Sequence, residues 1–327
     1  MKKATRFGAA FAAAAMIIVF LSSCSGPGPA PSDGRTVLTI GGTKINYDLY
    51  RYVFLNTRDD MDGGDHTVWQ GDYAAQAELN DAVLEVLTRN TAIEKLAAKY
   101  GVKLSADEKR EAAEAVAAQA AVTGSDGKTG RDLLEDAHMT EYAAYYVSCF
   151  TSLWGKIYNH VTNEENGILR FSDEELISAV PEKFTCISYV YIPRDKENAL
   201  QLALEASEKI SGGADFGDIV TEYGSDPDMS ARLEHGYYYV EGEIIDGVAD
   251  EAAALGPGET SGVIDLGQGY FIIRRLPVDM DYVRSDLSTF RTKYLAHLFN
   301  VMVDETAAGL DVKYGKPYAS LTVETVK

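Results

Sequence analysis

A change of hydrophobic pattern at Phe184 constrains the fold of this chain more than any other feature. Before it, apolar residues recur at helical spacing, as in the run from Leu79 to Tyr100, which Gly101 closes. After it, residues 185–192 form a β-branched and aromatic run that predicts a buried strand. Strand and helix patterns then alternate until helical spacing returns over residues 281–308. The sequence therefore predicts an α+β fold in which a small mixed module is inserted between helical segments.

Local signals predict where several elements of the first half begin and end. Asn46 is placed to cap a helix over Tyr47–Leu55, and Ser105 begins a capping-box pattern. The polar, glycine-rich residues 57–71 predict a loop, and residues 131–162 predict one continuous helix. The first half is therefore predicted to be almost entirely helical.

The first 23 residues have the pattern of a secretory signal peptide. Basic residues precede an apolar run that is too short to span a bilayer comfortably and that ends in small residues. Its end, Leu21-Ser22-Ser23-Cys24, resembles a lipobox, in which a bacterial signal is cut before a cysteine that takes a diacylglycerol. An ordinary signal with a coincidental cysteine is the alternative. We expect a lipid anchor on Cys24 and a flexible tether over residues 24–36.

Composition excludes several classes of partner. The formal net charge is −20, and loss of residues 1–23, which hold three basic residues and no acidic one, makes it −23. Such a surface repels nucleic acid, so we expect no nucleic-acid partner. Cys149 and Cys186 lie in apolar periodic contexts, which predicts two buried free thiols. The five histidines form no paired motif, and we expect no metal site and no cofactor.

The order of elements after residue 183 resembles a parvulin-type peptidyl-prolyl isomerase domain. The resemblance is carried by ISYVYI, FGDIVTEYGSDP, HGYYYVEGEII, LGPGETSGVI and GQGYFIIRRL. The helical flanks, including Leu79–Leu104, resemble the chaperone domain of PrsA and SurA foldases. The resemblance implies a foldase lipoprotein with these parts: signal peptide 1–23, tether 24–36, helical chaperone domain 37–182, parvulin-like domain 183–278, and a C-terminal helix and tail 279–327 that completes the chaperone domain.

The resemblance also transfers the family's site, residue by residue. The family histidine in the first strand, in the pattern A-S-H-I-L, falls on Tyr189, and the histidine in the last strand, in G-Y-H-I-I, falls on Phe271. The family's Asp or Cys falls on Asp226, so the resemblance implies Asp226 and Tyr189 as the catalytic residues. It implies four substrate-binding residues: Ile244, Val248, Leu266 and Phe271.

The same residues also have a structural interpretation. Tyr189 and Phe271 can fill the core as paired aromatic residues on neighbouring strands, and Asp226 can cap a turn before Pro227. A prolyl isomerase must favour the twisted amide over the planar one against a barrier of about 20 kcal/mol. Because both family histidines are replaced, the sequence predicts weak or absent isomerase activity.

The predicted function is that of a membrane-anchored, extracytoplasmic foldase. Its clients would be unfolded or partly folded secreted proteins, with proline-containing segments bound by the parvulin-like domain. One alternative is a pure holdase chaperone with a non-catalytic parvulin-like domain. The other is a solute-binding lipoprotein of an importer, which should show repeated β-α alternation across two lobes.

Overall fold

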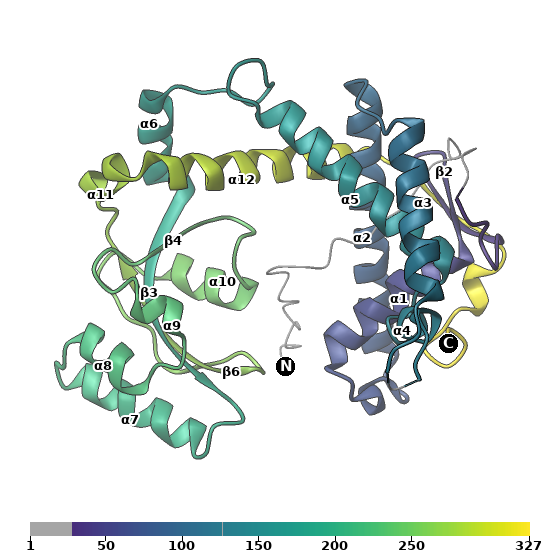
Figure 1. The fold of residues 1–327 in the computed structure, drawn as a ribbon. Helices are drawn as coiled ribbons and strands as arrows, with labels where there is room; N and C mark the ends of the chain where they lie inside the picture. Colours follow the sequence, from purple (N-terminus) through teal and green to yellow (C-terminus); the bar gives the residue numbers. More distant parts are fainter. Residues whose placement is uncertain (1–27, 126) are drawn as a thin grey trace. The chain divides into compact units, whose positions relative to one another are not determined.

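The computed structural model describes residues 28–125 and 127–327, which divide into two compact units (Figure 1). The mixed unit comprises Phe171–Leu298, and the helical unit comprises residues 28–170 together with Phe299–Lys327. Helix α12 (Leu287–Ala308) contributes residues to both units. Cys24 and the predicted signal peptide lie outside the described residues.

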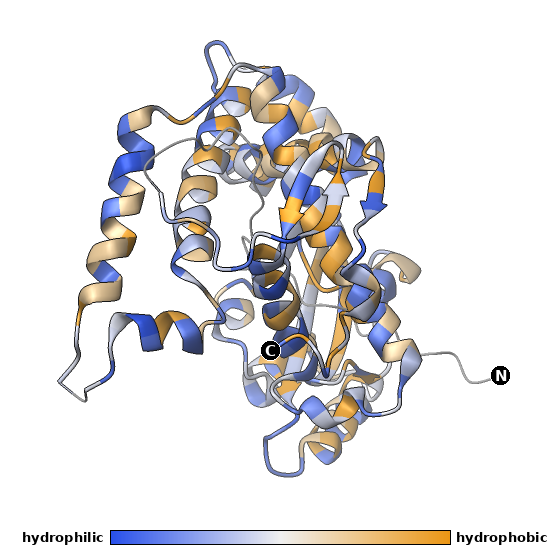
Figure 2. Ribbon diagram, turned by 90° about the vertical axis from the view of Figure 1, so that its right-hand side faces the viewer, coloured by the Kyte–Doolittle hydropathy of each residue, from blue (hydrophilic) through white to orange (hydrophobic). Residues whose placement is uncertain are grey.

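The helical unit is built mainly from amphipathic helices, which carry both hydrophobic and hydrophilic residues (Figure 2). Its helices and 3-10 turns are α1 (Tyr47–Asp62), η1 (His66–Trp69), α2 (Tyr73–Lys99), α3 (Ala106–Ala121), α4 (Gly130–Asp136), α5 (Glu141–Thr162) and η2 (Tyr318–Ser320). Three short antiparallel strands form a sheet in the order β2 (Thr43–Asn46), β1 (Thr36–Ile40) and β7 (Val312–Tyr314). The predominantly helical first half predicted from the sequence is confirmed.

The predicted helix caps are confirmed. The side chain of Asn46 accepts a hydrogen bond of 3.0 Å from the backbone nitrogen of Leu49, at the start of α1. Ser105 and Glu108 form both hydrogen bonds of a capping box at the start of α3. These side chains satisfy backbone N–H groups that have no partner inside the helix. Because each cap joins residues within one helical turn, the local sequence predicts it.

Two predicted boundaries are wrong. The predicted loop 57–71 begins as helix, because α1 continues to Asp62 and ends only at Gly63, whose φ of 60° is the left-handed conformation typical of a helix C-cap. The predicted helix 131–162 is interrupted at His138, which has φ 58°. Thr140 then caps a new helix, α5. Both differences bring residues of α1 and the α4–α5 connection into one network, described below.

The mixed unit has a four-stranded antiparallel sheet in the order β4-β3-β6-β5. Its strands are β3 (Phe184–Pro193), β4 (Tyr237–Val240), β5 (Ile264–Asp265) and β6 (Gly269–Leu276). Its remaining helices are α6 (Asp173–Lys183), α7 (Ala199–Ser211), α8 (Phe216–Tyr223), α9 (Pro227–Ser230), α10 (Asp246–Ala254) and α11 (Met280–Ser285). The predicted α+β class is confirmed, and the elements do not alternate as expected for a two-lobed solute-binding protein.

Helices outside the predicted limits 183–278 also pack on this sheet. Val180 of α6, Val283 of α11 and Phe290 of α12 share one buried cluster with Phe184 and Tyr238 of the sheet. The mixed unit therefore extends beyond residues 183–278 on both sides. Cys149 and Cys186 are buried thiols, as predicted, and neither forms a disulfide within the described residues. None of the helices within the described residues combines the length and apolar character needed to cross a bilayer.

Candidate functional site

Tyr189 lies on strand β3, beside the buried clusters that cover the two faces of the sheet. Because side chains alternate along a strand, Val190 lies in the buried cluster formed with α7 and α8, whereas Ile187 lies in the cluster of the opposite face. Tyr189 is partly buried and packs against both clusters. Tyr191, two residues along, is paired with Phe271 of β6, and their ring centroids lie 4.7 Å apart.

The four predicted substrate-binding residues come together in one apolar cluster with Tyr189. Val248 on α10 and Phe271 on β6 are buried, and two partly exposed residues, Ile244 and Leu266, pack against them. A Cβ at Gly247 would lie only 2.5 Å from Leu266 Cδ2, so the glycine permits this close packing. Whether these residues bind a proline stays a prediction, but the fold brings all of them to one face of the sheet.

Tyr189 and Asp226 are direct hydrogen-bond partners. The Tyr189 hydroxyl donates a short hydrogen bond to Oδ2 of Asp226. The other carboxylate oxygen, Oδ1, accepts from the backbone nitrogen of Asp228 at 2.9 Å and caps α9. Burial, and then the hydrogen bond to Asp226, raise the pKa of Tyr189 well above its usual value, so the phenol stays neutral. Asp226 therefore has both roles: it caps α9, and it accepts the hydrogen bond of Tyr189 at the predicted site.

This pairing limits what Tyr189 can do chemically. A phenol has a single O–H donor, and here Asp226 accepts it. Donation to a substrate carbonyl would require this hydrogen bond to break first. The arrangement supplies an apolar surface beside a hydrogen-bonded polar pair, which suits the binding of an apolar ring next to a peptide group.

A second tyrosine of the same region was not selected by sequence reasoning. Tyr237 packs against the same two clusters as Tyr189, and its hydroxyl donates to Oε1 of Glu243 at 3.2 Å. Lys293 of α12 forms an ion pair with Glu243 and lies 4.9 Å from the Tyr237 ring centroid. Burial and then Glu243 raise the pKa of Tyr237 to about 12. Tyr237 is part of the aromatic run 237–239, which is visible in the sequence. No local pattern, however, could connect it to Lys293.

The helical unit holds a group of potential metal-ligating side chains. Donor atoms of Asp59, Asp62 and His66 lie within 4.8 Å of one another. Each carboxylate, however, already accepts hydrogen bonds, Asp59 from Arg58 and Asp62 from His66. A metal ion would have to displace these partners, and we do not assign a metal to the group.

Comparison with protein families identifies two domains in the chain. Residues 1–143 match the model of the SurA-like N-terminal domain. Residues 184–276 match the PPIC-type PPIASE domain, which is the parvulin type. The second match begins at the first residue of β3 and ends at the last residue of β6, so it includes the apolar cluster and the Tyr189–Asp226 pair.

Solved structures similar to this chain include one parvulin and several PrsA proteins. The parvulin NmPin of Nitrosopumilus maritimus is 29% identical over 29% of this chain and 98% of its own, with a TM-score of 0.25. PrsA from Bacillus subtilis is 18% identical over 84% of this chain and 91% of its own, with a TM-score of 0.29. Foldase protein PrsA from Streptococcus pneumoniae is 18% identical over 73% and 90%, with a TM-score of 0.33. No curated protein matches the chain. We therefore identify its two domains from the matches to the two family models.

Proposed function

We propose that this chain, a PrsA/SurA-like foldase with a parvulin-type peptidyl-prolyl isomerase domain, works on secreted proteins outside the cytoplasm while a lipid on Cys24 holds it to a membrane. The anchor is supported by the lipobox-like Leu21-Ser22-Ser23-Cys24 at the end of a short apolar run. The net charge of −20 disfavours direct attraction to anionic headgroups, so a covalent lipid is the more consistent means of attachment.

The parvulin-type domain, in this proposal, binds proline-containing segments but isomerises them slowly. The observation that carries it is the hydrogen bond from Tyr189 to Asp226 beside the apolar cluster. Catalysis requires interactions that are stronger with the twisted amide than with the planar one. Neither Tyr189 nor Phe271 offers an imidazole, and the Tyr189 hydroxyl already donates to Asp226. The apolar lining of Ile244 and Leu266 can still contact a proline ring.

Holding of unfolded clients is assigned to the helical unit, which is largely the SurA-like part of the chain. This division predicts that the two activities can be separated by mutation. A pure holdase, in which the parvulin-type domain only binds, is the alternative, and the replacement of both family histidines by Tyr189 and Phe271 favours it.

The experiment compares prolyl isomerisation of a proline tetrapeptide with suppression of client aggregation by the mature chain. We expect slow turnover that Asp226→Ala abolishes and Tyr189→Phe alters, with client holding preserved in both variants. Asp250→Ala is the matched control, because Asp250 is an exposed carboxylate on α10 of the same unit. No turnover in the wild type, with holding intact, would establish the pure holdase. Turnover equal in wild type, Asp226→Ala and Tyr189→Phe would refute the site assignment.

A further inference from the structure

The helical unit contains a hollow of about 500 Å³, a size typical of small-ligand sites. It is lined by α1, η1, the connection before α5 and the last residues of the sequence. Its apolar lining residues are Leu55, Trp69, Val323 and Val326, and its polar lining residues are Arg58, His66, Gln70, His138, Glu324 and Lys327. The hollow is therefore amphipathic, with a predominance of basic groups among its polar residues.

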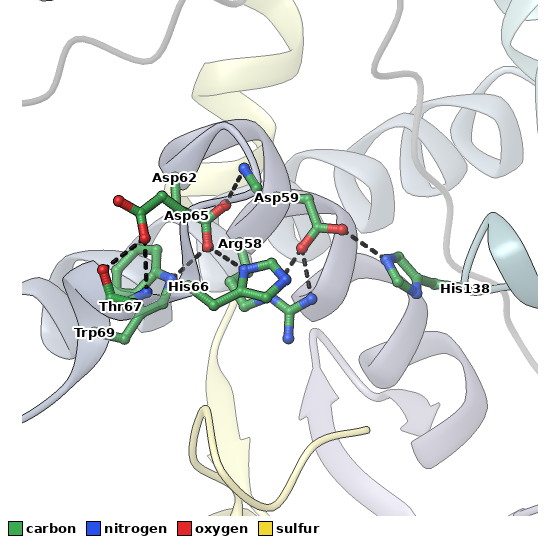
Figure 3. A network of polar contacts seen from close by, with 9 residues as sticks. Arg58, Asp59, Asp62, Asp65, His66, Thr67, Trp69 and His138 are labelled. Carbon is green, nitrogen blue, oxygen red and sulfur yellow. Dashed lines mark hydrogen bonds and ion pairs between the residues drawn. The ribbon is translucent and has the colours of Figure 1, made fainter.

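One aspartate behind the hollow fixes two of its lining rings (Figure 3). The side chain of Asp62 is fully buried and accepts hydrogen bonds of 2.6 Å from His66 Nδ1 and 2.6 Å from Trp69 Nε1. Burial alone would raise the pKa of Asp62, but these hydrogen bonds outweigh it and lower the pKa, so the group is a carboxylate. A charged acceptor shared by both rings holds the indole and the imidazole in fixed orientations.

A second aspartate, Asp59, orients Arg58 and His138 in the same way (Figure 3). Asp59 accepts from Nε and Nη2 of Arg58 at 2.8 and 2.6 Å, and from Nε2 of His138 at 2.7 Å. The Arg58 side chain is only 12% exposed. Its remaining nitrogen, Nη1, has no hydrogen-bond partner within residues 28–125 and 127–327, and Arg58 lines the hollow. Neither aspartate is itself a lining residue.

We propose that this hollow binds an apolar group that carries a carboxylate. Nη1 of Arg58 and the ammonium group of Lys327, which forms no ion pair within the described part of the chain, would bind the carboxylate. Val323, a partly exposed apolar residue of the lining, would contact the apolar part beside the largely buried ring of Trp69. Glu324 is the one acidic residue of this lining, and its carboxylate accepts from Thr322 at 2.6 Å. Asp59 already binds Nε and Nη2 of Arg58, so a bound carboxylate would contact the Nη1 that this pair leaves open.

Two sources present this chemistry: the terminal carboxylate of a polypeptide with an apolar last residue, and a free small carboxylate. The inference does not depend on prolyl isomerisation, because all lining residues belong to the helical unit and none belongs to the parvulin-type domain. It does not depend on client holding either, because its test measures the binding of a small carboxylate and not the suppression of aggregation. A failure of the proposed function would therefore leave it standing.

The test uses the indole N–H signals of the full chain in NMR spectra. The chain has two tryptophans, and Trp154 serves as the internal control because it does not line the hollow. Titration with 3-phenylpropionate should shift the Trp69 signal and leave the Trp154 signal in place. 3-Phenylpropanamide, which lacks the charge, should bind at least about ten-fold more weakly. A peptide ending in Ala-Leu-Phe, with a free or an amidated end, forms the second arm.

Substitutions of Arg58 and Lys327 test whether the charges of the hollow bind the carboxylate. Arg58→Gln, which keeps an amide donor for Asp59, should weaken 3-phenylpropionate binding about ten-fold or more. Lys327→Met should weaken it several-fold and tests the same charge without disturbing Asp59. Lys103→Met, an exposed lysine of the same unit outside the hollow, is the matched control and should have no effect.

Binding of the free-ended peptide as well would assign the hollow to polypeptide ends, and binding of 3-phenylpropionate alone would assign it to small carboxylates. Equal binding of acid and amide would overturn the proposal. So would an unmoved Trp69 signal with both probes, or equal losses in Lys327→Met and Lys103→Met.

Discussion

Replacing Glu94 by glutamine should stabilise the helical unit by an amount that increases with pH. Glu94 lies on α2, is 4% exposed, and neither carboxylate oxygen has a hydrogen-bond partner among the described residues. The side-chain nitrogen of Asn90, one turn earlier, is buried without a partner as well. Burial raises the pKa of Glu94 well above its usual value, and the nearby Lys95 offsets this only in part.

The sign and size follow from proton linkage. In the unfolded chain Glu94 ionises near a pH of about 4.3, whereas the folded chain retains the proton to higher pH. The stability associated with the neutral carboxyl is thus present below the unfolded pKa and is lost as pH rises toward the folded pKa. The loss approaches about 1.4 kcal/mol per pH unit, or up to about 2.7 kcal/mol between pH 5 and pH 7. Glu94→Gln does not titrate, so its advantage over the wild type should increase by up to that amount.

Urea denaturation followed by tryptophan fluorescence measures this effect, because Trp69 and Trp154 both lie in the helical unit. Glu85→Gln on the exposed side of α2 is the matched control and should change stability by less than about 0.5 kcal/mol at either pH. An advantage of Glu94→Gln that is the same at pH 5 and pH 7 would refute the reasoning. It would mean that Glu94 is already ionised in the folded protein at pH 5.

Two further predictions concern single residues. Gly236→Ala should destabilise the mixed unit by about 2–4 kcal/mol in calorimetry, because Gly236 has φ 76° and a Cβ would lie 2.6 Å from Leu276 Cδ1 and 2.8 Å from Cys186 Sγ. Gly242→Ala, with φ 81° but open space, should cost only about 1–2 kcal/mol, and equal costs would contradict the packing argument. Cys24→Ala should abolish labelling by a radioactive fatty acid and release the protein from membranes, whereas Cys149→Ala should remain labelled. Label persisting in Cys24→Ala would exclude acylation at this position.

Local sequence was sufficient for the features that depend on neighbouring residues. The caps at Asn46 and Ser105 involve backbone groups within one helical turn, so residue type and spacing predict them. The switch of pattern at Phe184 predicts the start of the sheet, because apolar side chains recur at a different spacing in a strand than in a helix. The resemblance to parvulins then selected Tyr189, Asp226 and the apolar residues around them.

Long-range contacts could not be derived in this way. The sequence left open whether Tyr189 serves catalysis or packing, and only the fold shows its hydroxyl donating to Asp226, 37 positions later. Likewise, Lys293 reaches Glu243 across 50 positions, outside the matched isomerase domain.

The hollow in the helical unit illustrates the same limit. Its lining joins α1 to residues 323–327, and His138 reaches Asp59 because the chain turns at a left-handed residue where helical periodicity predicted a continuous helix. Periodicity and caps report interactions within a few residues, so the sequence by itself determined the elements and their order. Which side chains meet depends on how those elements pack, and that was decided only by the tertiary structure.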